Sequence, residues 1–393
     1  MPNNDFTSKL LMLEDAIIEN VEIFSTHTEI SFKLKRRPHS CPCCGNVTEK
    51  IHDYRTSKIK DIPVSGQKTI LLYSKRRYHC DSCNKHFYES FPLVPKHCRT
   101  TTRLAFFSVS LLNSRQSVRS AADLSGVSVS FVFRRLQDLK FPKPEVLPQV
   151  LSIDEFKGNA GGQKFQAIIT DPKKHKVIDI LPSRTQATLS NYFSTFKNRK
   201  DVRFFVMDMN RAYLEIAKTY FPKATIVIDK FHVVRYVTWA LENVRKKIQK
   251  QMHPDKRKYF KRSRRLLLTH KEKLNDESIL ALEVMLQQSS ELATAYHLKE
   301  LFYTFIKAKD RNEASELMHK FIISTEASGL KEFDACLTML RNWATYILNA
   351  FDCGYSNGFT EGTNNSIKVI KRNAFGYRNF QNFRNRILMS VNK

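Results

Sequence analysis

Three apolar runs of the sequence each end in an aspartate, and this pattern predicts a metal site. The runs occupy residues 150–154, 204–208 and 225–229, which end in Asp154, Asp208 and Asp229. Each is typical of a buried β-strand, and the carboxyl ends of strands in an open α/β sheet border a common crevice. Carboxylates gathered there repel one another unless a cation lies between them. We therefore expect divalent cations at this edge, with helix capping as the alternative role for a single aspartate.

A helix beside the first strand must supply a third carboxylate, and Glu361 is our candidate. Its segment carries further polar residues at helical spacing: Asn364 or Asn365, Lys368 and Arg372. Residues three or four apart share one face of a helix, so this face would offer a metal ligand, an amide and cations for a DNA backbone. Glu155 is a rival for the metal, but strand alternation directs it away from Asp154.

The elements that must position these acids alternate between strands and helices. We expect strands near 150–156, 164–171, 176–182, 202–208 and 224–229, with helices near 185–199 and 210–220. Three strands in a meander and two reached through helices match a ribonuclease-H-like sheet, whose first and fourth strands are central neighbours. Asp154 and Asp208 would then stand side by side. With one more acid they could hold two Mg²⁺ (or Mn²⁺) ions about 4 Å apart for phosphodiester displacement.

The fifth strand is followed by the sequence Asp229-Lys-Phe-His232. We assign this pair an accessory role, in which Asp229 orients His232 or borders the site. The alternative for His232 is a satisfied buried histidine, because histidine is of intermediate burial.

Two C-x-x-C units predict a structural zinc site. They are Cys41-Pro-Cys-Cys44 and Cys80-Asp-Ser-Cys83. Each turn places two thiolates on one side, and two such turns together supply tetrahedral coordination by four sulfurs. We take Cys43 as a spacer residue, while His79 and His86 are possible substitutes for one thiolate. Unrelated buried cysteines are the alternative interpretation.

Residues 117–136 have the pattern of a helix, a glycine turn and a second helix. Gly126 lies at the turn, and Ser128 can cap the second helix. As a recognition helix in the major groove, that helix would present four side chains to DNA: Ser128, Ser130, Arg134 and Arg135. The alternative is a plain helical hairpin.

The composition narrows the class of protein. The chain of 393 residues has a net charge of +27, which is typical of nucleic-acid binding, with a generic basic protein as the alternative. No run approaches the roughly 20 apolar residues that a membrane span requires. The N-terminus lacks the pattern of a secretory signal, and the clustered cysteines indicate a reducing compartment rather than a disulfide scaffold. We therefore expect a cytoplasmic protein with no membrane partner.

The chain is long enough for several domains, and we expect a multidomain α/β protein. Three prolines within residues 141–148 indicate a linker. The expected domains are an N-terminal region at 1–98 with a zinc ribbon at about 38–90, a helix-turn-helix domain at 99–140, a ribonuclease-H-like core at 149–230 and 352–393, and an all-helical insertion at 231–351.

The early part of the expected insertion is dense in cations, which we interpret as a track for a DNA backbone rather than a solvated face. The residues assigned to this track are Lys246, Lys247, Lys250, Arg262, Arg264 and Arg265. Trp239 and Trp343 could stack on an unpaired base. We expect core packing for both instead, because tryptophan is highly buried on average.

The motifs together resemble the DDE transposases of bacterial insertion sequences, in particular the group called ISL-three. The motifs that carry the resemblance are Cys-Pro-x-Cys-Gly at 41–45, Arg-Arg-Tyr-x-Cys-x-x-Cys at 76–83, Ile153-Asp-Glu-Phe156, Met207-Asp-Met-Asn210, Asp229-Lys-Phe-His-Val233 and Glu361-Gly-x-Asn-Asn-x-Ile-Lys. By position, Asp154, Asp208 and Glu361 match the acidic triad of that family.

This resemblance implies a ribonuclease-H-like catalytic core, dependence on Mg²⁺ and binding of terminal inverted repeats. We expect an enzyme that cuts double-stranded DNA at these repeats and joins the freed 3′-hydroxyl to target DNA. Two ends must be held together, so a homodimer or higher oligomer is expected. The alternatives are a non-enzymatic, transposase-derived regulator and a structure-specific, Mg²⁺-dependent nuclease of the same fold.

Overall fold

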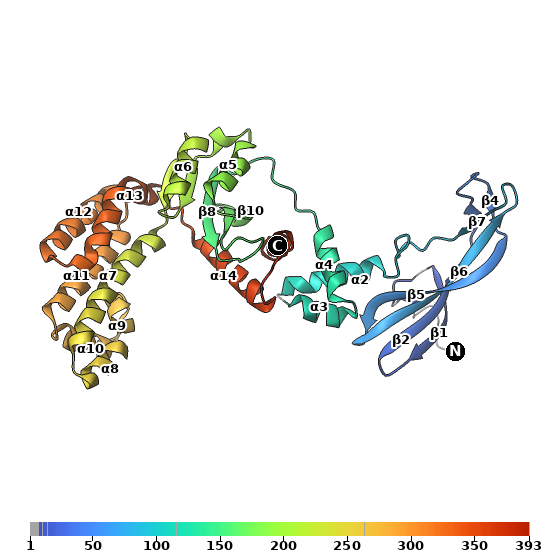
Figure 1. The fold of residues 1–393 in the computed structure, drawn as a ribbon, viewed down its shortest axis with the longest axis horizontal. Coiled ribbons are helices and arrows are strands. Elements are labelled where there is room, and N and C mark those ends of the chain that lie inside the picture. Colours follow the sequence, from blue (N-terminus) through green and yellow to red (C-terminus); the bar gives the residue numbers. More distant parts are fainter. Residues whose placement is uncertain (1–7, 10, 14, 115, 263, 393) are drawn as a thin grey trace. The chain divides into compact units, whose positions relative to one another are not determined.

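The computed structural model describes residues 8–9, 11–13, 15–114, 116–262 and 264–392. The chain forms two compact units (Figure 1). The first comprises Met1–Phe141 and Val369–Val391, and the second comprises Pro142–Lys368 with Asn392. Among the helices of the described ranges, none is both long enough and apolar enough to cross a membrane.

A five-stranded sheet forms the N-terminal part of the first unit. Its strands are β1 (Ala16–Ile23), β2 (His27–Leu34), β5 (Ile51–Val64), β6 (Gln67–Cys80) and β7 (Lys85–Tyr88). They pair in the order β1-β2-β6-β5, and β7 also pairs with β6. Alternate residues of β2 and β6 point to one face, where Phe32, Leu71 and Tyr73 form a buried core. A short separate hairpin pairs β3 (His39–Ser40) with β4 (Val47–Thr48).

The rest of the first unit is helical, with α2 (Thr102–Ser110), a 3₁₀ turn (Leu111–Ser114), α3 (Val118–Ser125), α4 (Val129–Asp138) and α15 (Phe380–Val391). Leu112, Ala121 and Val132 belong to their common core. Gly126 ends α3 with a φ of 66°, in the left-handed region that favours glycine. A side chain there would also approach Cγ of Lys68 to 2.8 Å.

The placement of α15 differs from our expectation that residues 352–393 all belong with the catalytic sheet. Within the first unit, Nδ2 of Asn385 donates hydrogen bonds to the carbonyl oxygens of Leu136 and Leu139, at 2.9 and 3.1 Å. The last carbonyls of a helix lack partners inside the helix, so this amide satisfies the end of α4. Helix α15 therefore completes the core of the first unit.

The second unit is built on a sheet of β8 (Val150–Phe156), β9 (Gln166–Asp171), β10 (Lys176–Leu181), β11 (Phe204–Met207) and β12 (Thr225–Ile228). The order is β10-β9-β8-β11-β12. Strand β8 runs antiparallel to β9 and parallel to β11, so the predicted adjacency of the first and fourth strands is confirmed. Helices α5 (Gln186–Ser194) and α6 (Arg211–Tyr220) lie near the predicted bounds.

Both faces of this sheet are covered. On one face, Ile153 and Phe205 share a core with Phe193 of α5 and Tyr213 of α6. On the other, Val206 and Val227 pack with residues of the long helix α13 (Asp334–Cys353). Cover on both faces explains why these strands are nearly continuous apolar runs.

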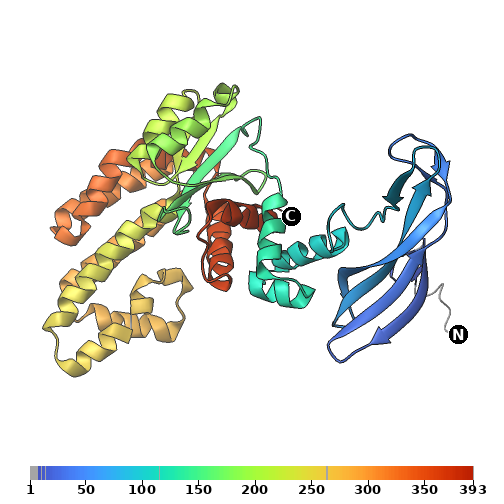
Figure 2. The ribbon, with the colours of Figure 1, turned by 45° about the vertical axis from the view of Figure 1, so that its right-hand side comes forward.

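The expected helical insertion follows β12 directly. It consists of α7 (Lys230–Gln251), α8 (Pro254–Arg262), α9 (Arg264–Leu268), α10 (Asp276–Leu286), α11 (Ser290–Ile306), α12 (Arg311–Ser328) and α13. Two 3₁₀ turns, Lys271–Lys273 and Lys331–Phe333, lie between these helices. Outside the insertion, a further 3₁₀ turn at Arg199–Asp201 precedes β11. Helix α7 leads from the sheet into this helical region (Figures 1 and 2). The chain then returns to the sheet in α14 (Gly358–Asn373), which begins with the segment that contains Glu361.

Candidate functional site

Four carboxylates gather at the carboxyl edge of the second sheet. Asp154 lies near the end of β8, and Asp208 and Asp229 directly follow β11 and β12. Glu361 lies in the first turn of α14. The ligand atoms of Asp229, His232 and Glu361 all lie within 4.8 Å of one another. The structure thus brings together acids that are far apart in the sequence.

His232 lies between two of the predicted catalytic acids. Its Nε2 atom is 3.2 Å from Oδ1 of Asp208 and 3.7 Å from Oε1 of Glu361. The ring stands in the first turn of α7, which begins at the edge of the sheet right after Asp229. The accessory histidine is therefore part of the acid cluster, and it is only partly buried.

Asp154 is held by a residue that we assigned to DNA binding. Oδ2 of Asp154 accepts a hydrogen bond from Nδ2 of Asn364 at 2.7 Å, and the two residues are only 6% and 7% exposed. Asn364 follows Glu361 by about one helical turn and faces the sheet. We assigned Asn364 to a DNA backbone, but its amide is buried against the acid and holds the Asp154 carboxylate.

A network of small polar side chains fixes the start of α14. The Thr360 hydroxyl shares hydrogen bonds with the hydroxyls of Ser152 in β8 and Thr170 in β9, at 3.3 and 2.8 Å. Asn357 contacts Ser152 through its side chain and donates its backbone N–H to Oδ1 of Asp229 at 3.4 Å. Sequence reasoning missed these residues, although a serine within the apolar strand β8 is a visible signal.

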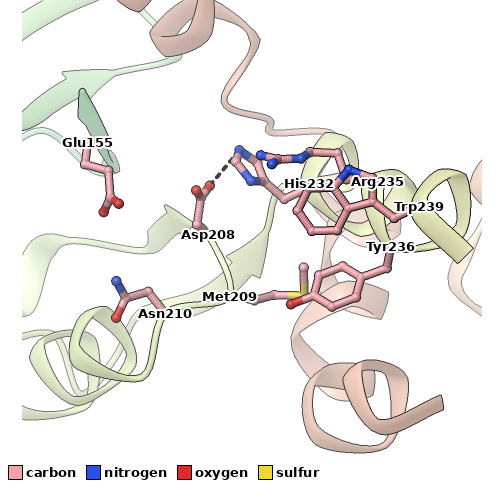
Figure 3. Close-up of a pocket in the computed structure, with 8 residues that line it drawn as sticks. All are labelled: Glu155, Asp208, Met209, Asn210, His232, Arg235, Tyr236 and Trp239. Carbon is pink, nitrogen blue, oxygen red and sulfur yellow. Dashed lines mark ion pairs between the residues drawn. The ribbon is translucent and has the colours of Figure 1, made fainter. Parts of the chain in front are cut away.

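Glu155 takes part in the site from the opposite face of β8. Its Oε2 accepts a hydrogen bond from the Tyr213 hydroxyl at 2.7 Å, and Arg184 pairs with its other oxygen. Glu155 and Asp208 nevertheless line the same hollow, which Figure 3 shows together with His232. Side chains alternate between the two faces of β8, so Glu155 and Asp154 point to opposite faces. Glu155 still lies close to the cluster, beside Asp208.

The electrostatics of the cluster fit a divalent cation. Burial raises the pKa of Asp154 to about 7, and the charges of Glu155 and Glu361 add to the rise. Burial likewise raises the pKa of Asp208 to about 8, with further repulsion from Asp154 and Asp229. Oδ2 of Asp229 is buried and has no hydrogen-bond partner among the described residues. Oxygen donors without a compensating charge suit Mg²⁺ or Mn²⁺.

We expect the metal-free protein to lose stability as the pH rises from about 5 to 9. Asp208 keeps its proton in the fold up to a pKa of about 8, whereas the ordinary value is 3.8. The unfolded chain then binds fewer protons than the folded one, so the free energy of unfolding falls with pH in this window. Asp208→Asn should flatten the dependence of the free energy of unfolding on pH. It should also raise the melting temperature at pH 8, by about 2–4 °C for each kcal/mol gained in the free energy of unfolding.

Thermal denaturation in Mg²⁺-free buffer without chelator measures this effect, since a chelator would also remove zinc. Asp201→Asn is the matched control, because Asp201 is exposed and lies outside the cluster. A wild-type melting temperature that rises across this pH range would contradict the prediction.

Four cysteines of the first unit form a second candidate metal site. The sulfurs of Cys41, Cys44, Cys80 and Cys83 all lie within 4.8 Å of one another. Two of these pairs, Cys41–Cys83 and Cys44–Cys80, are 3.5 Å apart. Tetrahedral bonds of about 2.3 Å to zinc require sulfurs about 3.8 Å apart, so the cluster needs little adjustment.

Cys41 and Cys44 lie in the turn of the β3–β4 hairpin, whereas Cys80 ends β6 and Cys83 lies in the turn that leads to β7. Cys43 is exposed and lies outside the cluster, as expected of a spacer residue. Nε2 of His79 is 3.1 Å from Asp81, and its ring contacts that of His86. Neither histidine belongs to the four-sulfur group that the structure describes.

Helix α4 presents part of the predicted recognition surface. The Ser128 hydroxyl caps the helix by accepting the backbone N–H of Phe131 at 3.1 Å. Ser130 and Arg134 are exposed and lie one turn apart. Arg135 pairs with Asp138 at 3.0 Å, with its guanidinium 5.5 Å from the centre of the Phe131 ring. Ser130 and Arg134 are thus the side chains most available to a ligand.

Some of the cations that we assigned to a DNA-backbone track line a common hollow. A hollow of about 810 Å³ lies along the end of α7 and the start of α8, and it is lined by Asn243, Arg245, Lys246, Lys247, Gln249, Lys250, Pro254, Arg257, Lys258 and Lys261. Lys246 and Lys250 are exposed. Lys247 pairs with Glu291 and Glu332, at 3.0 and 3.5 Å. Its charge is therefore partly compensated.

The other cations that we assigned to DNA binding differ in their exposure and in their ion pairs. Arg264 lies 3.4 Å from Glu242, which also holds the buried Arg245, whereas Arg265 is exposed. The side chain of Arg262 lies outside the described residues. On α14, Lys368 and Arg372 are both exposed, and Nζ of Lys368 donates to Oδ1 of Asn365 at 3.2 Å.

The expectation of core packing for both tryptophans is wrong for one of them. Trp343 packs against the helical core of the second unit. Trp239 is 54% exposed, because α7 packs through another face that includes Val237, Ala240 and Leu241. The exposed indole lines the hollow beside Asp208.

These features define a multidomain α/β protein with a carboxylate cluster at the edge of a five-stranded sheet, a separate four-cysteine site and a strong positive charge. The model of the ISL3 family of DDE transposases, described as "Transposase", matches residues 151–387. The chain belongs to this family, which is the ISL-three group named above. Residues 37–83 match a second family, the "zinc-finger of transposase IS204/IS1001/IS1096/IS1165".

Individual relatives agree with this family. The transposase for insertion sequence element IS1001 of Bordetella parapertussis is 26% identical over 351 residues, covering 87% of this chain and 86% of that protein. The transposase for IS1557 of Mycobacterium tuberculosis is 23% identical over 243 residues, or 56% of this chain and 54% of that protein. A Lactococcus lactis protein named as an ATP-dependent protease is 35% identical, over only 27% of this chain and 32% of its own length.

Proposed function

We propose that this protein binds the terminal inverted repeats of an insertion sequence and catalyses Mg²⁺-dependent cleavage and strand transfer of DNA. The gathering of Asp154, Asp208 and Glu361 at one sheet edge is the observation that carries the proposal. It is supported by the family, whose members act on DNA. The order of the five strands further supports a ribonuclease-H-like core.

In this proposal the three acids hold the metal, and bound Mg²⁺ would stabilise charge on the attacking and leaving oxygens. Asn364 fixes the orientation of the Asp154 carboxylate through its hydrogen bond of 2.7 Å. Nε2 of His232 lies 3.2 Å from Oδ1 of Asp208, within ion-pair distance, and would position that acid when the imidazole is protonated. Asp229 borders the cluster and anchors the backbone of Asn357.

The first unit supplies the DNA-binding modules of the proposal. The four cysteines would hold structural Zn²⁺, and helices α3 and α4 would act as a helix-turn-helix whose Ser130 and Arg134 reach the groove. Because two DNA ends must meet, the active form would be a homodimer or higher oligomer. The protein would act in the bacterial cytoplasm, where the chromosome lies.

Reversal of charge in the basic hollow tests the proposed track. We expect the double change Lys246→Glu and Lys250→Glu to weaken binding of double-stranded DNA about equally for all sequences. The slope of log affinity against log salt should fall by about 0.9 for each lost phosphate contact. Lys200→Glu is the matched control, since Lys200 is exposed and lies elsewhere. DNA affinity would be measured over a range of salt concentrations. If the double variant has the same slope as the wild type, these lysines do not contact the DNA backbone.

The function itself is tested with DNA that carries the repeats flanking the gene. Incubation with Mg²⁺ should give strand cleavage at the repeat ends and joined products with a target plasmid. Binding without cleavage would indicate a regulator, and cleavage without joining would indicate a nuclease.

A further inference from the structure

The first turns of α7 present aromatic and cationic side chains to a hollow beside the acids (Figure 3). The hollow has a volume of about 220 Å³, and its lining includes Asp208, His232, Arg235, Tyr236 and Trp239. The acids form its polar end, and the rings form its opposite wall. One cavity therefore joins the proposed catalytic cluster to an aromatic surface.

The aromatic wall is exposed yet ordered by its neighbours. The guanidinium carbon of Arg235 lies 4.6 Å from the centre of the Trp239 ring. The Tyr236 and Trp239 rings are 6.3 Å apart and inclined at 50°. The indole has a contact on one side but remains 54% exposed. Such a flat apolar surface, held next to a cation, is suited to stacking against another planar group.

The size and charge of this hollow indicate which kind of ligand it can bind. The volume is below the roughly 300–1,000 Å³ of pockets for drug-sized ligands, so it suits a single planar ring system. Arg235 beside the rings would attract a phosphate, and the basic hollow further along α7 has the same preference. A base in a duplex has both faces covered by its neighbours, so only an unpaired base can stack on a side chain.

We propose that this hollow receives one unpaired base of the DNA strand that flanks the cleaved phosphodiester, stacked on Trp239. The inference rests on the proposed function, because it takes DNA as the substrate. It deepens that function by giving α7 two roles, since the helix places His232 in the acid cluster and, two turns later, holds the neighbouring nucleotide. Trp239 is a binding residue here and takes no part in the chemical step.

The sequence offers a selective probe, because the chain has only two tryptophans. In a Trp343→Phe variant, Trp239 is the sole source of indole fluorescence. We would titrate this variant, without Mg²⁺, with a short single-stranded oligodeoxynucleotide and with the same oligonucleotide carrying abasic residues. Stacking should quench the fluorescence with the first ligand, and the abasic ligand should quench much less and bind about ten-fold more weakly.

Changes at Trp239 give a second measurement that needs no fluorescence. Trp239→Ala should weaken single-strand binding about ten-fold, whereas Trp239→Phe should keep most of the affinity. Loss of the difference between base-containing and abasic ligands in Trp239→Ala would locate the stacking at this residue. An unchanged melting temperature shows that the variants are folded.

Equal quenching and equal affinity for the two ligands would overturn the inference, as would full affinity in Trp239→Ala. Neither measurement requires cleavage. Base-dependent binding in a protein that never cuts DNA would therefore reject the proposed enzyme but keep the hollow as a base site. Mg²⁺-dependent cleavage without base-dependent quenching would reject the hollow alone.

Discussion

Replacement of Asp208 by asparagine is expected to reduce Mg²⁺-dependent strand transfer by about 10³-fold or more, equivalent to about 4 kcal/mol of transition-state stabilisation. Asp208 lies at the centre of the sheet edge, next to the strand that bears Asp154, and its Oδ1 is 3.2 Å from His232. An amide has nearly the same shape but no charge to hold a cation. Asp154→Asn and Glu361→Gln should cause losses of the same order.

Asp229 is the rival for the second acid of the triad, and the comparison of the two variants decides between them. Its ligand atom lies within 4.8 Å of those of His232 and Glu361. If Asp229 only supports the site, Asp229→Asn should reduce Mg²⁺-dependent strand transfer by about 10–100-fold. A loss of this size is usual for residues that orient metal ligands. Full activity in Asp208→Asn together with an inactive Asp229→Asn would transfer the role to Asp229.

These measurements need a control for general damage. Asp201→Asn should behave like the wild type in strand transfer. DNA binding should persist in every acid variant, because the zinc-ribbon and helical modules are unchanged. A variant that loses binding and activity together would indicate misfolding rather than loss of a metal ligand.

Loss of zinc is the second change with a large expected effect. The Cys41 and Cys80 side chains are buried in the four-sulfur cluster. Cys41 belongs to the β3–β4 hairpin and Cys80 to the β6–β7 hairpin. Structural zinc contributes apparent binding energies of about 10–16 kcal/mol in zinc-finger peptides at pH 7. That contribution exceeds what two short hairpins can supply by packing. Cys41→Ser or Cys80→Ser should therefore unfold the segment around the cluster and abolish selective binding of repeat ends.

Metal content and limited proteolysis measure this outcome. Wild type should carry one zinc ion per chain, and the two variants should lose it and become sensitive to protease between residues 37 and 83. Cys43→Ser is the matched control, because Cys43 is an exposed neighbour of the cluster and should keep the zinc. Zinc bound at full occupancy in Cys41→Ser would contradict the four-sulfur assignment.

The sequence predicts the sheet of the second unit well, because its information is local. Strands β8, β11 and β12 are short apolar runs. Asp154 lies near the end of β8, and Asp208 and Asp229 directly follow β11 and β12. The pattern of connections then allows few strand orders, and the predicted adjacency of the first and fourth strands is observed. The cysteine cluster is equally local, since each C-x-x-C unit forms its own turn.

What the sequence does not predict depends on contacts between distant segments. The buried position of Asn364 follows from the docking of α14, which Ser152 and Thr170 determine through Thr360. The exposure of Trp239 depends on which face of α7 meets the other helices. The packing of α15 on α4 requires the Asn385 amide to find carbonyls that are remote in the chain. The docking of α14 and α15 has no periodic signal in the sequence, whereas the helical spacing of Val233, Val237 and Val244 along α7 does place Trp239 on another face.

The order of the acids along the chain has a consequence for protein synthesis. Asp154 and Asp208 emerge from the ribosome before the whole helical insertion, and Glu361 emerges after it. At about 5–20 residues per second, the gap between the first and third acids corresponds to roughly 10–40 s of translation. If the proposed function holds, a nascent chain would fold its zinc ribbon and hold DNA well before it could cut. Products that stop within the insertion would occupy DNA without the third acid, and would compete with the complete protein.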